Sequence, residues 1–249
     1  MSTETARSGI FSNNALKIIA AALMVCDHVG MLLFPGVSVF RNIGRLAFPI
    51  FAYLIAEGAK YTRNYLRYFL TMASFATVIQ IGYYCFRQSL EMSVMVTFTL
   101  SLMIIFSLDC FKAAIFTKNP SKLMIAATAA LLFGTVCCVA ILDRILDLDY
   151  RFWGCMLPVF PSLLTTPKVK EPPAIFQTLD KKLPRILAAA IGTLILALHS
   201  SRSQFYGLLA IPLLLLYSEQ RGKWNIKYFF YVFYPLHLVI LYGISMLVK

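Results

Sequence analysis

An aspartate and a histidine stand side by side within an otherwise apolar run, LMVCDHVGMLLF, at residues 23–34. An ionisable side chain at the centre of a bilayer costs about 2.5–3.5 kcal/mol on the insertion scale, so it normally faces a protein interior or a cavity. A functional role is therefore the first hypothesis for Asp27 and His28. Adjacent helical residues point about 100° apart, so Asp27 is not expected to orient His28. We expect Asp27 to meet a group on another helix, such as Arg45, in a functional cavity or in a purely structural ion pair.

Lys17 precedes His28 by eleven residues. Eleven helical steps return to nearly the same face and cover about 16 Å. A cation at one end of this face and a base at the other would suit a long anionic cofactor such as coenzyme A, which carries phosphates at one end and a thioester at the other. A neutral imidazole can act as a general base toward an amine or hydroxyl that attacks the thioester. The structural alternative is that His28 hydrogen-bonds another helix while Lys17 extends to the lipid headgroups.

Other polar residues lie within or beside apolar runs. Glu57 either ends such a run near water or reaches a cavity, and Arg45 is either an interfacial anchor or a cavity residue. His237 lies one turn into the last apolar run. Asp149 and Tyr150 belong to a short loop that would cap a cavity from outside. No nucleophile elbow, Walker loop, zinc-protease helix motif or dinucleotide fingerprint occurs, which excludes the common soluble chemistries.

Apolar segments of helical length recur through the 249 residues, of which 59% are hydrophobic and 14% charged. This pattern predicts an all-α fold, a polytopic integral membrane helical bundle with about nine transmembrane helices. We expect one domain over residues 1–249. The second segment can span only if Arg45 or Glu57 comes toward membrane depth. The predicted spans are 15–35, 42–60, 64–86, 93–115, 121–142, 152–166, 186–199, 205–218 and 226–248.

The net charge of +12 does not indicate nucleic-acid binding, because the basic residues lie between the apolar segments. Most Lys and Arg follow the even-numbered predicted spans, which predicts that these loops and the N-terminus are cytoplasmic. The six cysteines fall mostly inside apolar runs and are expected to be buried small hydrophobes, with no metal site. The polar N-terminus has no cleavage-site pattern, so no signal peptide is expected.

Several stretches, in this order, resemble the TraX family. They are LKIIAAALMVCDHVG, RNIGRLAFPIFAYLIAEGAKYTRNYLRYF, VTFTL, LDLDYRFWGCMLP, QFYGLLAIPLLLLYSEQRG and KYFFYVFYPLHLVILYGI, and together they extend over almost the whole chain. The family is associated with acetylation of the conjugative pilin N-terminus. It looks like a branch of the transmembrane acyltransferases, which use cytoplasmic acetyl-CoA. Bacterial O-acyltransferases of that superfamily have an Arg, ten residues and then a His in the first span. Lys17 and His28 match that spacing, with a lysine that binds phosphate as a point charge.

The resemblance implies an integral membrane acetyltransferase in the bacterial inner membrane. Its donor is acetyl-CoA, and its acceptor is an amine, such as a pilin or peptide N-terminus, or a hydroxyl. His28 and Asp27 are the expected catalytic residues, and Lys17 and Arg45 are expected to bind the cofactor. The remaining candidates are expected to contact substrate or line the cavity; they are Glu57, Asp149, Tyr150, Tyr234 and His237.

Two other functions fit the same residues. A proton-coupled transporter would use Asp27 and Glu57 as carriers, although the inverted repeats typical of transporters are not evident. A non-catalytic assembly factor for a pilus or secretion system would tolerate His28→Ala but not changes in its surface loops. An acyltransferase predicts the reverse.

Overall fold

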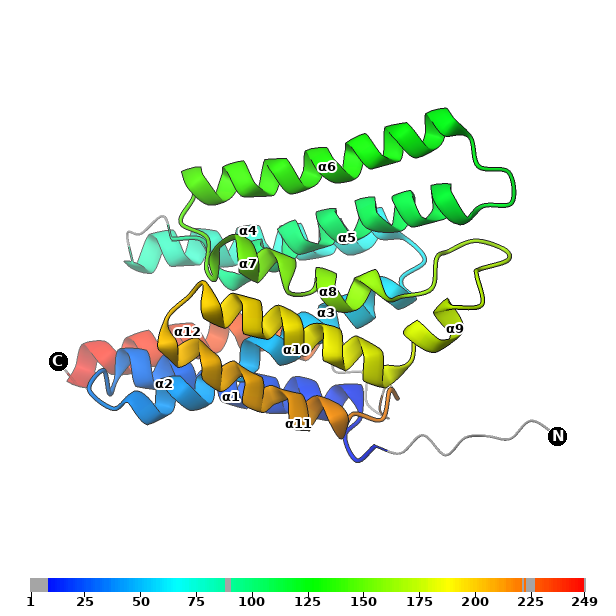
Figure 1. Ribbon diagram of the computed structural model, residues 1–249. Coiled ribbons are helices and arrows are strands. Elements are labelled where there is room, and N and C mark those ends of the chain that lie inside the picture. The colour runs from blue at the N-terminus through cyan, green and yellow to red at the C-terminus, as the bar shows by residue number, and fades with distance from the viewer. Residues whose placement is uncertain (1–8, 88–90, 221, 223–226, 249) are drawn as a thin grey trace. The chain divides into compact units, whose positions relative to one another are not determined.

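A computed structural model describes residues 9–87, 91–220, 222 and 227–248. The described residues form helices and no β-strand, which confirms the all-α prediction (Figure 1). Helices satisfy their own backbone hydrogen bonds, as an apolar solvent requires. The elements are α1 Asn13–Leu32, α2 Ser38–Gly44, α3 Ala47–Tyr61, α4 Tyr65–Arg87, α5 Val94–Phe116, α6 Lys122–Ile145, α7 Arg151–Met156, α8 Val159–Leu163, α9 Phe176–Leu179, α10 Lys182–Leu198, the 3₁₀ helix η1 Arg202–Leu209, α11 Ala210–Leu215 and α12 Lys227–Val248.

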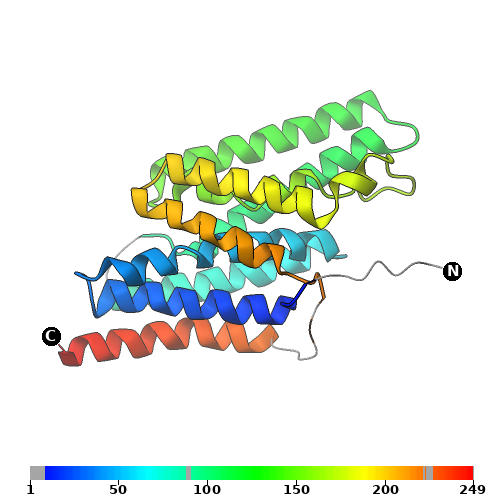
Figure 2. The same ribbon diagram turned by 60° about the horizontal axis from the view of Figure 1, so that its bottom comes forward.

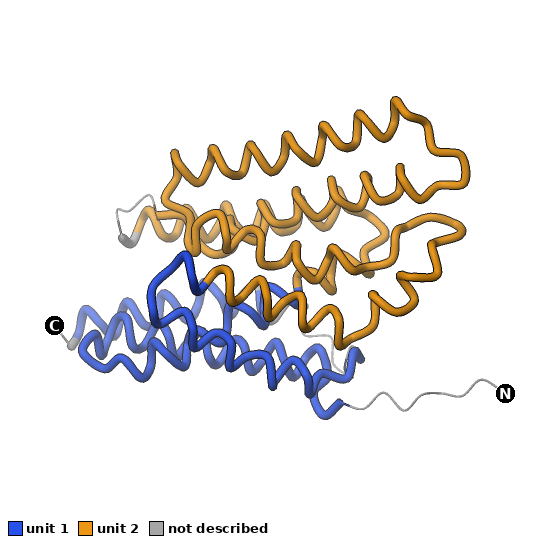
Figure 3. The backbone as a smooth tube through the Cα atoms, in the orientation of Figure 1, with its two compact units in different colours: residues 1–54, 197–249 blue, residues 55–196 orange. Residues whose placement is uncertain are grey.

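The chain divides into two compact units (Figure 3). Unit 1 contains residues 1–54 and 197–249, and unit 2 contains residues 55–196. Helix α3 therefore begins in unit 1 and ends in unit 2. That the whole chain acts as one domain stays a prediction.

Unit 1 is organised around α1, which packs against α2 and α12 (Figure 2). The side chain of Ser12 caps α1 by accepting a hydrogen bond from the backbone N–H of Ala15 at 3.2 Å. Helices α1 and α2 approach so closely that a methyl group at Gly44 would overlap the side chain of Asp27. The small residue therefore permits the contact between these two helices.

Unit 2 is organised around α5, which packs against α4, α6, α7 and α8. Helix α5 is largely buried, whereas most of α6 is exposed, as suits a helix that faces lipid. Hydroxyl side chains within α5 donate to backbone carbonyls of their own helix, for example Thr99 to Met95 at 2.8 Å and Ser101 to Thr97 at 2.9 Å. Their polar groups are thus satisfied inside an apolar environment.

Four helical segments among the described residues are long and apolar enough to cross a membrane: α1, α2 with α3, α5 and α6. A fifth apolar helix, within α12, is shorter. Every predicted span coincides with helical residues, but the sixth and eighth are broken into short pieces, α7 with α8 and η1 with α11. Pro158 lacks a backbone N–H and stands at the break between α7 and α8. Nine complete spans are therefore not confirmed, and their number stays a prediction.

Charge is distributed unevenly between the two ends of unit 2. One end holds the C-termini of α3 and α5 and the N-termini of α4, α6 and α10, and it carries Lys60, Arg63, Arg67, Lys112, Lys118, Lys122, Lys168, Lys170, Lys181, Lys182 and Arg185. The opposite end carries Glu91, Asp143, Asp147 and Asp149, with fewer cations. Such asymmetry is typical of membrane proteins whose basic end is cytoplasmic. Two residues of the charge pattern, Arg221 and Lys223, lie outside the described residues.

Candidate functional site

Two histidines that are 209 positions apart in the chain meet inside unit 1. His28 of α1 and His237 of α12 lie with Nδ1 of the first 2.9 Å from Nε2 of the second. Their ring planes are nearly parallel, with centroids 5.1 Å apart. We call His28 and His237 the histidine pair. Two predicted site residues from different helices are thus within hydrogen-bond distance.

Aromatic residues of α12 surround the second member of the pair. The ring of His237 is buried, stacks on Phe233 at 5.3 Å and meets the buried Tyr234 edge-on at 5.5 Å. Nδ1 of His237 lies 3.0 Å from the backbone carbonyl of Phe233. Every nitrogen of His237 therefore has a hydrogen-bond partner, and its ring is held by packing on several sides.

The histidine pair has the chemistry of a general base. A neutral imidazole has one nitrogen that donates and one that accepts a proton, and its ordinary pKa lies near neutrality. His28 is half-buried, whereas His237 is buried. The more accessible ring is therefore suited to meet a substrate, and the buried ring is suited to support it.

The side chain of Asp27 contacts a different helix from the one that its neighbour His28 contacts. Its Oδ2 accepts a hydrogen bond from Arg41 of α2 at 2.7 Å. Its Oδ1 is buried with no hydrogen-bond partner among the described residues and faces Gly44. Arg45 adds a second positive charge within electrostatic reach of this carboxylate. A partner on another helix was expected, but the hydrogen bond comes from Arg41, one helical turn before the residue that the sequence suggested.

Lys17 and His28 belong to one uninterrupted helix, α1. The predicted spacing of about 16 Å along one face therefore applies to them. Lys17 is half-buried. Its role in binding an anionic donor stays a prediction.

Glu57 lies in unit 2, in a buried ion pair with Arg185 of α10. Both side chains are almost completely inaccessible, and Nε of Arg185 is also 3.7 Å from Asp180. The pair belongs to a larger set of buried or half-buried charges that we call the charged cluster. Its members are Glu57, Lys60, Asp109, Lys112, Lys168, Asp180 and Arg185.

Three segments are tied together by the charged cluster. Asp180, just after α9, forms an ion pair with Lys60 at 2.9 Å and accepts hydrogen bonds from the backbone and hydroxyl of Thr166 at 3.0 and 2.7 Å. Burial would raise the pKa of the Asp180 carboxyl, but Lys60 and Thr166 outweigh burial and hold the pKa below its ordinary value. The loop after α8 is thereby fixed to the end of α3.

Lys112 and Lys168, two lysines of the cluster, donate mainly to backbone carbonyls. Lys112 donates to the carbonyls of Ser162 and Thr165, each at 2.8 Å, where α8 ends. Lys168 donates to the carbonyl of Ala59 at 3.0 Å and lies 3.6 Å from Asp109. Burial lowers the pKa of Lys168 against the opposing effect of Asp109. The sequence had indicated the cations of the cluster only as loop charges, because helix-end lysines normally anchor at the membrane surface. Sequence reasoning did not single out Asp109, which lies inside the predicted span 93–115.

Asp149 and Tyr150 lie at the opposite end of unit 2 from the charged cluster, between α6 and α7. The backbone carbonyl of Asp149 accepts a hydrogen bond from Thr97 at 2.7 Å. Tyr150 and Arg151 both have positive φ angles, 62° and 55°. Residues other than glycine rarely adopt this conformation. The hydrogen bond from Thr97 of α5 and the packing of α7 therefore hold the turn in place. The role of Asp149 and Tyr150 at a substrate site stays a prediction.

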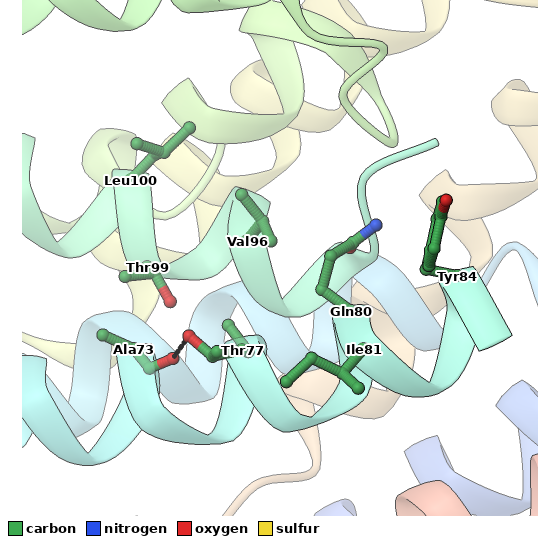
Figure 4. Close-up of a pocket in the computed structure, with 9 residues that line it drawn as sticks. Ala73, Thr77, Gln80, Ile81, Tyr84, Val96, Thr99 and Leu100 are labelled. Atoms are coloured by element: carbon green, nitrogen blue, oxygen red, sulfur yellow. Dashed lines mark hydrogen bonds between the residues drawn. The ribbon is translucent and has the colours of Figure 1, made fainter. Parts of the chain in front are cut away.

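A cavity of about 470 Å³ opens between α4 and α5 (Figure 4). Apolar side chains such as Ala76, Ile81 and Val96 line most of it. Gln80, at one end, receives a hydrogen bond from the backbone N–H of Ser93 at 3.0 Å and donates to the carbonyl of Glu91 at 2.9 Å. None of the predicted site residues lines this cavity.

Comparison with known proteins points to one family. The family model described as TraX protein matches residues 12–245. A probable fimbrial assembly protein, FimC of serogroup H1 from Dichelobacter nodosus, is 25% identical over 262 residues, covering 96% of this chain and 98% of that protein. No solved structure matches the chain.

Proposed function

Because the chain belongs to the TraX family, we propose that it is an integral membrane acetyltransferase that serves pilus or fimbrial assembly. Acetyl-CoA is the donor. The acceptor is an amine, such as the N-terminus of a pilin or another peptide, or a hydroxyl. The observation that carries the proposal is the histidine pair, a hydrogen-bonded pair of imidazoles between α1 and α12.

His28 acts as the general base in this proposal. It removes a proton from the acceptor as the acceptor nitrogen or oxygen attacks the thioester carbon. The new C–N or C–O bond forms, the C–S bond breaks, and the departing thiolate of coenzyme A takes up the proton from the imidazolium. General-base catalysis of this kind contributes roughly 100- to 10,000-fold to a rate.

Lys17 is the proposed contact of the donor's phosphates, and Arg45, which acts on Asp27 beside His28, is proposed to bind the donor nearer its thioester end. Their charges favour an anion in a medium of low dielectric constant, and the uninterrupted helix α1 supports the spacing of Lys17 and His28. We place the chain in the bacterial inner membrane with its N-terminus in the cytoplasm, where acetyl-CoA is found. The basic loops that follow the even-numbered predicted spans support this orientation.

A non-catalytic role in assembly is the second candidate, because the fimbrial relative is named for assembly and not for an enzymatic reaction. In that case the histidine pair would be a structural hydrogen bond between α1 and α12. The transporter alternative is less favoured, since Asp27 and Glu57 are each ion-paired with an arginine and not presented as single proton carriers.

Acetyl-CoA binding tests the proposal most directly. A ligand that binds the folded state raises its apparent stability, so saturating acetyl-CoA should raise the melting temperature of the detergent-solubilised protein. Lys17→Ala should weaken this shift, and His28→Ala should retain it while losing transfer to a peptide amine. His199→Gln, at an exposed histidine, is the matched control and should behave like wild type. No shift with well-folded protein, together with pilus assembly that survives His28→Ala, would favour the assembly factor.

A further inference from the structure

We propose that His237 is a positioning residue that fixes the tautomer of His28, so that Nε2 of His28 is the atom that accepts the proton. This inference rests on the proposed function for its catalytic consequence. Its structural content, the protonation pattern of two rings, stands on the hydrogen bonds alone.

The tautomer of His237 follows from its contact with the backbone carbonyl of Phe233, which can only accept a hydrogen bond. The backbone carbonyl of Phe233 has no proton to give, so Nδ1 of His237, 3.0 Å away, carries the hydrogen. A neutral imidazole carries only one N–H, so Nε2 of His237 is unprotonated and accepts hydrogen bonds through its lone pair. Nδ1 of His28 lies 2.9 Å from Nε2 of His237 and must then be the donor in this hydrogen bond. In this tautomer the lone pair of the His28 ring lies on Nε2, the atom to which a proton would add.

Packing keeps this arrangement in one state. His237 is buried at 6% exposure, between the ring of Phe233 and the ring of His28, with Tyr234 against its edge. Rotating its ring would break two hydrogen bonds and leave buried polar atoms without partners, which is unfavourable. His28 therefore meets a fixed acceptor and does not exchange freely between tautomers.

The arrangement supports His28 when it becomes charged. After Nε2 of His28 takes a proton from the acceptor, the ring is an imidazolium whose Nδ1–H still donates to His237. A hydrogen bond from a charged donor is stronger than one from a neutral donor. His237 thus stabilises the charged form of the base without touching the reacting atoms, and the proton leaves again to the thiolate of coenzyme A.

Ring-nitrogen NMR on protein labelled at its histidines tests the tautomer without any assay of activity. The chain has three histidines, so His199→Gln leaves only the signals of the histidine pair. At a pH well above the ordinary histidine pKa of about 6.5, both remaining rings should be protonated on Nδ1 and bare on Nε2. A ring of the pair protonated on Nε2 instead would overturn the proposal. Because only His199 is changed, the pair itself is observed in its native form.

Substitutions of His237 test the consequence for catalysis. In His237→Gln the amide oxygen lies near the position of Nε2 and can still accept from His28, whereas His237→Phe keeps the ring shape but offers no acceptor. We expect kcat for release of coenzyme A in the presence of a peptide amine to fall about 100-fold or more in His237→Phe, with the KM for acetyl-CoA unchanged. His237→Gln should recover most of the loss.

The outcomes separate the two proposals. If His28→Ala loses transfer but His237→Phe, still folded by its melting temperature, transfers at the wild-type rate, the positioning role is wrong and the proposed function stands. If His28→Ala itself transfers normally, the proposed function is wrong. Equal loss in His237→Gln and His237→Phe, with both proteins folded, would also overturn the positioning role, because an acceptor at that point would then not matter.

Discussion

Asp27 and His28 are consecutive residues whose side chains bind different helices. The carboxylate of Asp27 binds α2 through Arg41, and the imidazole of His28 binds α12 through His237. One turn of α1 therefore joins two neighbours by two polar contacts of different kinds. The first is a charge pair suited to holding helices together, and the second is a hydrogen-bonded pair of imidazoles.

Removing the charge of Asp27 should weaken the fold more than it weakens donor binding. Asp27→Asn breaks the partly buried ion pair with Arg41, and losing a hydrogen bond between charged groups costs roughly 1.5–3 kcal/mol. The expected result is a lower melting temperature with the acetyl-CoA shift retained. Thermal unfolding of Asp27→Asn, Arg41→Gln and the double variant measures the pair. A double variant that loses the full sum of the two single effects would show that the residues do not interact.

Adding one methyl group at Gly44 should destabilise unit 1. A Cβ there would overlap Asp27, so Gly44→Ala forces α1 and α2 apart at a cost of about 1–3 kcal/mol. Gly82→Ala is the control, because Gly82 lies in helix α4 with nothing within 4 Å of its missing Cβ. That change should be neutral or should stabilise by up to about 1 kcal/mol. Equal melting temperatures for the two variants would contradict the close approach of α1 and α2.

Breaking the buried ion pair of unit 2 should cost more than replacing it. Glu57→Gln leaves the inaccessible Arg185 with only the more distant Asp180 carboxylate, at 3.7 Å, which costs up to about 3–5 kcal/mol. Changing both residues, as Glu57→Leu with Arg185→Met, should lose much less, since no charge is then left uncompensated. Melting temperatures in one detergent compare the two variants. If the double variant is the less stable of the two, the prediction is wrong, and the ion pair stabilises unit 2 more than an apolar pair at the same positions does.

Acid should remove the contribution of Asp180. Its pKa is below the ordinary value of 3.8, so its ionised form stabilises the fold above that value, and this contribution is lost as the pH falls through the depressed pKa. Asp180→Asn should therefore melt below wild type at neutral pH, with the difference closing once the pH drops below about 4. Asp147→Asn, at an exposed ion pair with Arg151, is the control and should differ little from wild type throughout. A gap for Asp180→Asn that does not close in acid would show that the carboxylate charge is not its cause.

The two ends of unit 2 should lie on opposite sides of the membrane. In a variant without the six native cysteines, Lys118→Cys should resist a membrane-impermeant maleimide in intact spheroplasts, and Asp147→Cys should react. Both positions are exposed and stand in loops at opposite ends. Permeabilised cells, in which both should react, provide the control. Labelling of Lys118→Cys alone would reverse the proposed orientation.

The sequence by itself determined the features that depend on local periodicity and on the solvent. Its apolar segments predicted the all-α fold and the positions of the long helices, because only helices satisfy the backbone in lipid, whereas the short helix α9 lies between two predicted spans. The turn of 100° per residue predicted that Asp27 and His28 would not face each other, and it placed Lys17 and His28 on one face of α1. These are properties of a single helix, which its own residues decide.

Only the tertiary structure decided which helices meet. Three contacts depend on packing between separate segments: α12 brings His237 to His28, Arg41 donates a hydrogen bond to Asp27, and Arg185 pairs with Glu57. From a single sequence, an arginine at a helix end that anchors at the membrane surface cannot be distinguished from one that forms a buried ion pair with a carboxylate. The difference arises when burial makes an unpaired charge costly, and that cost exists only once the helices have packed.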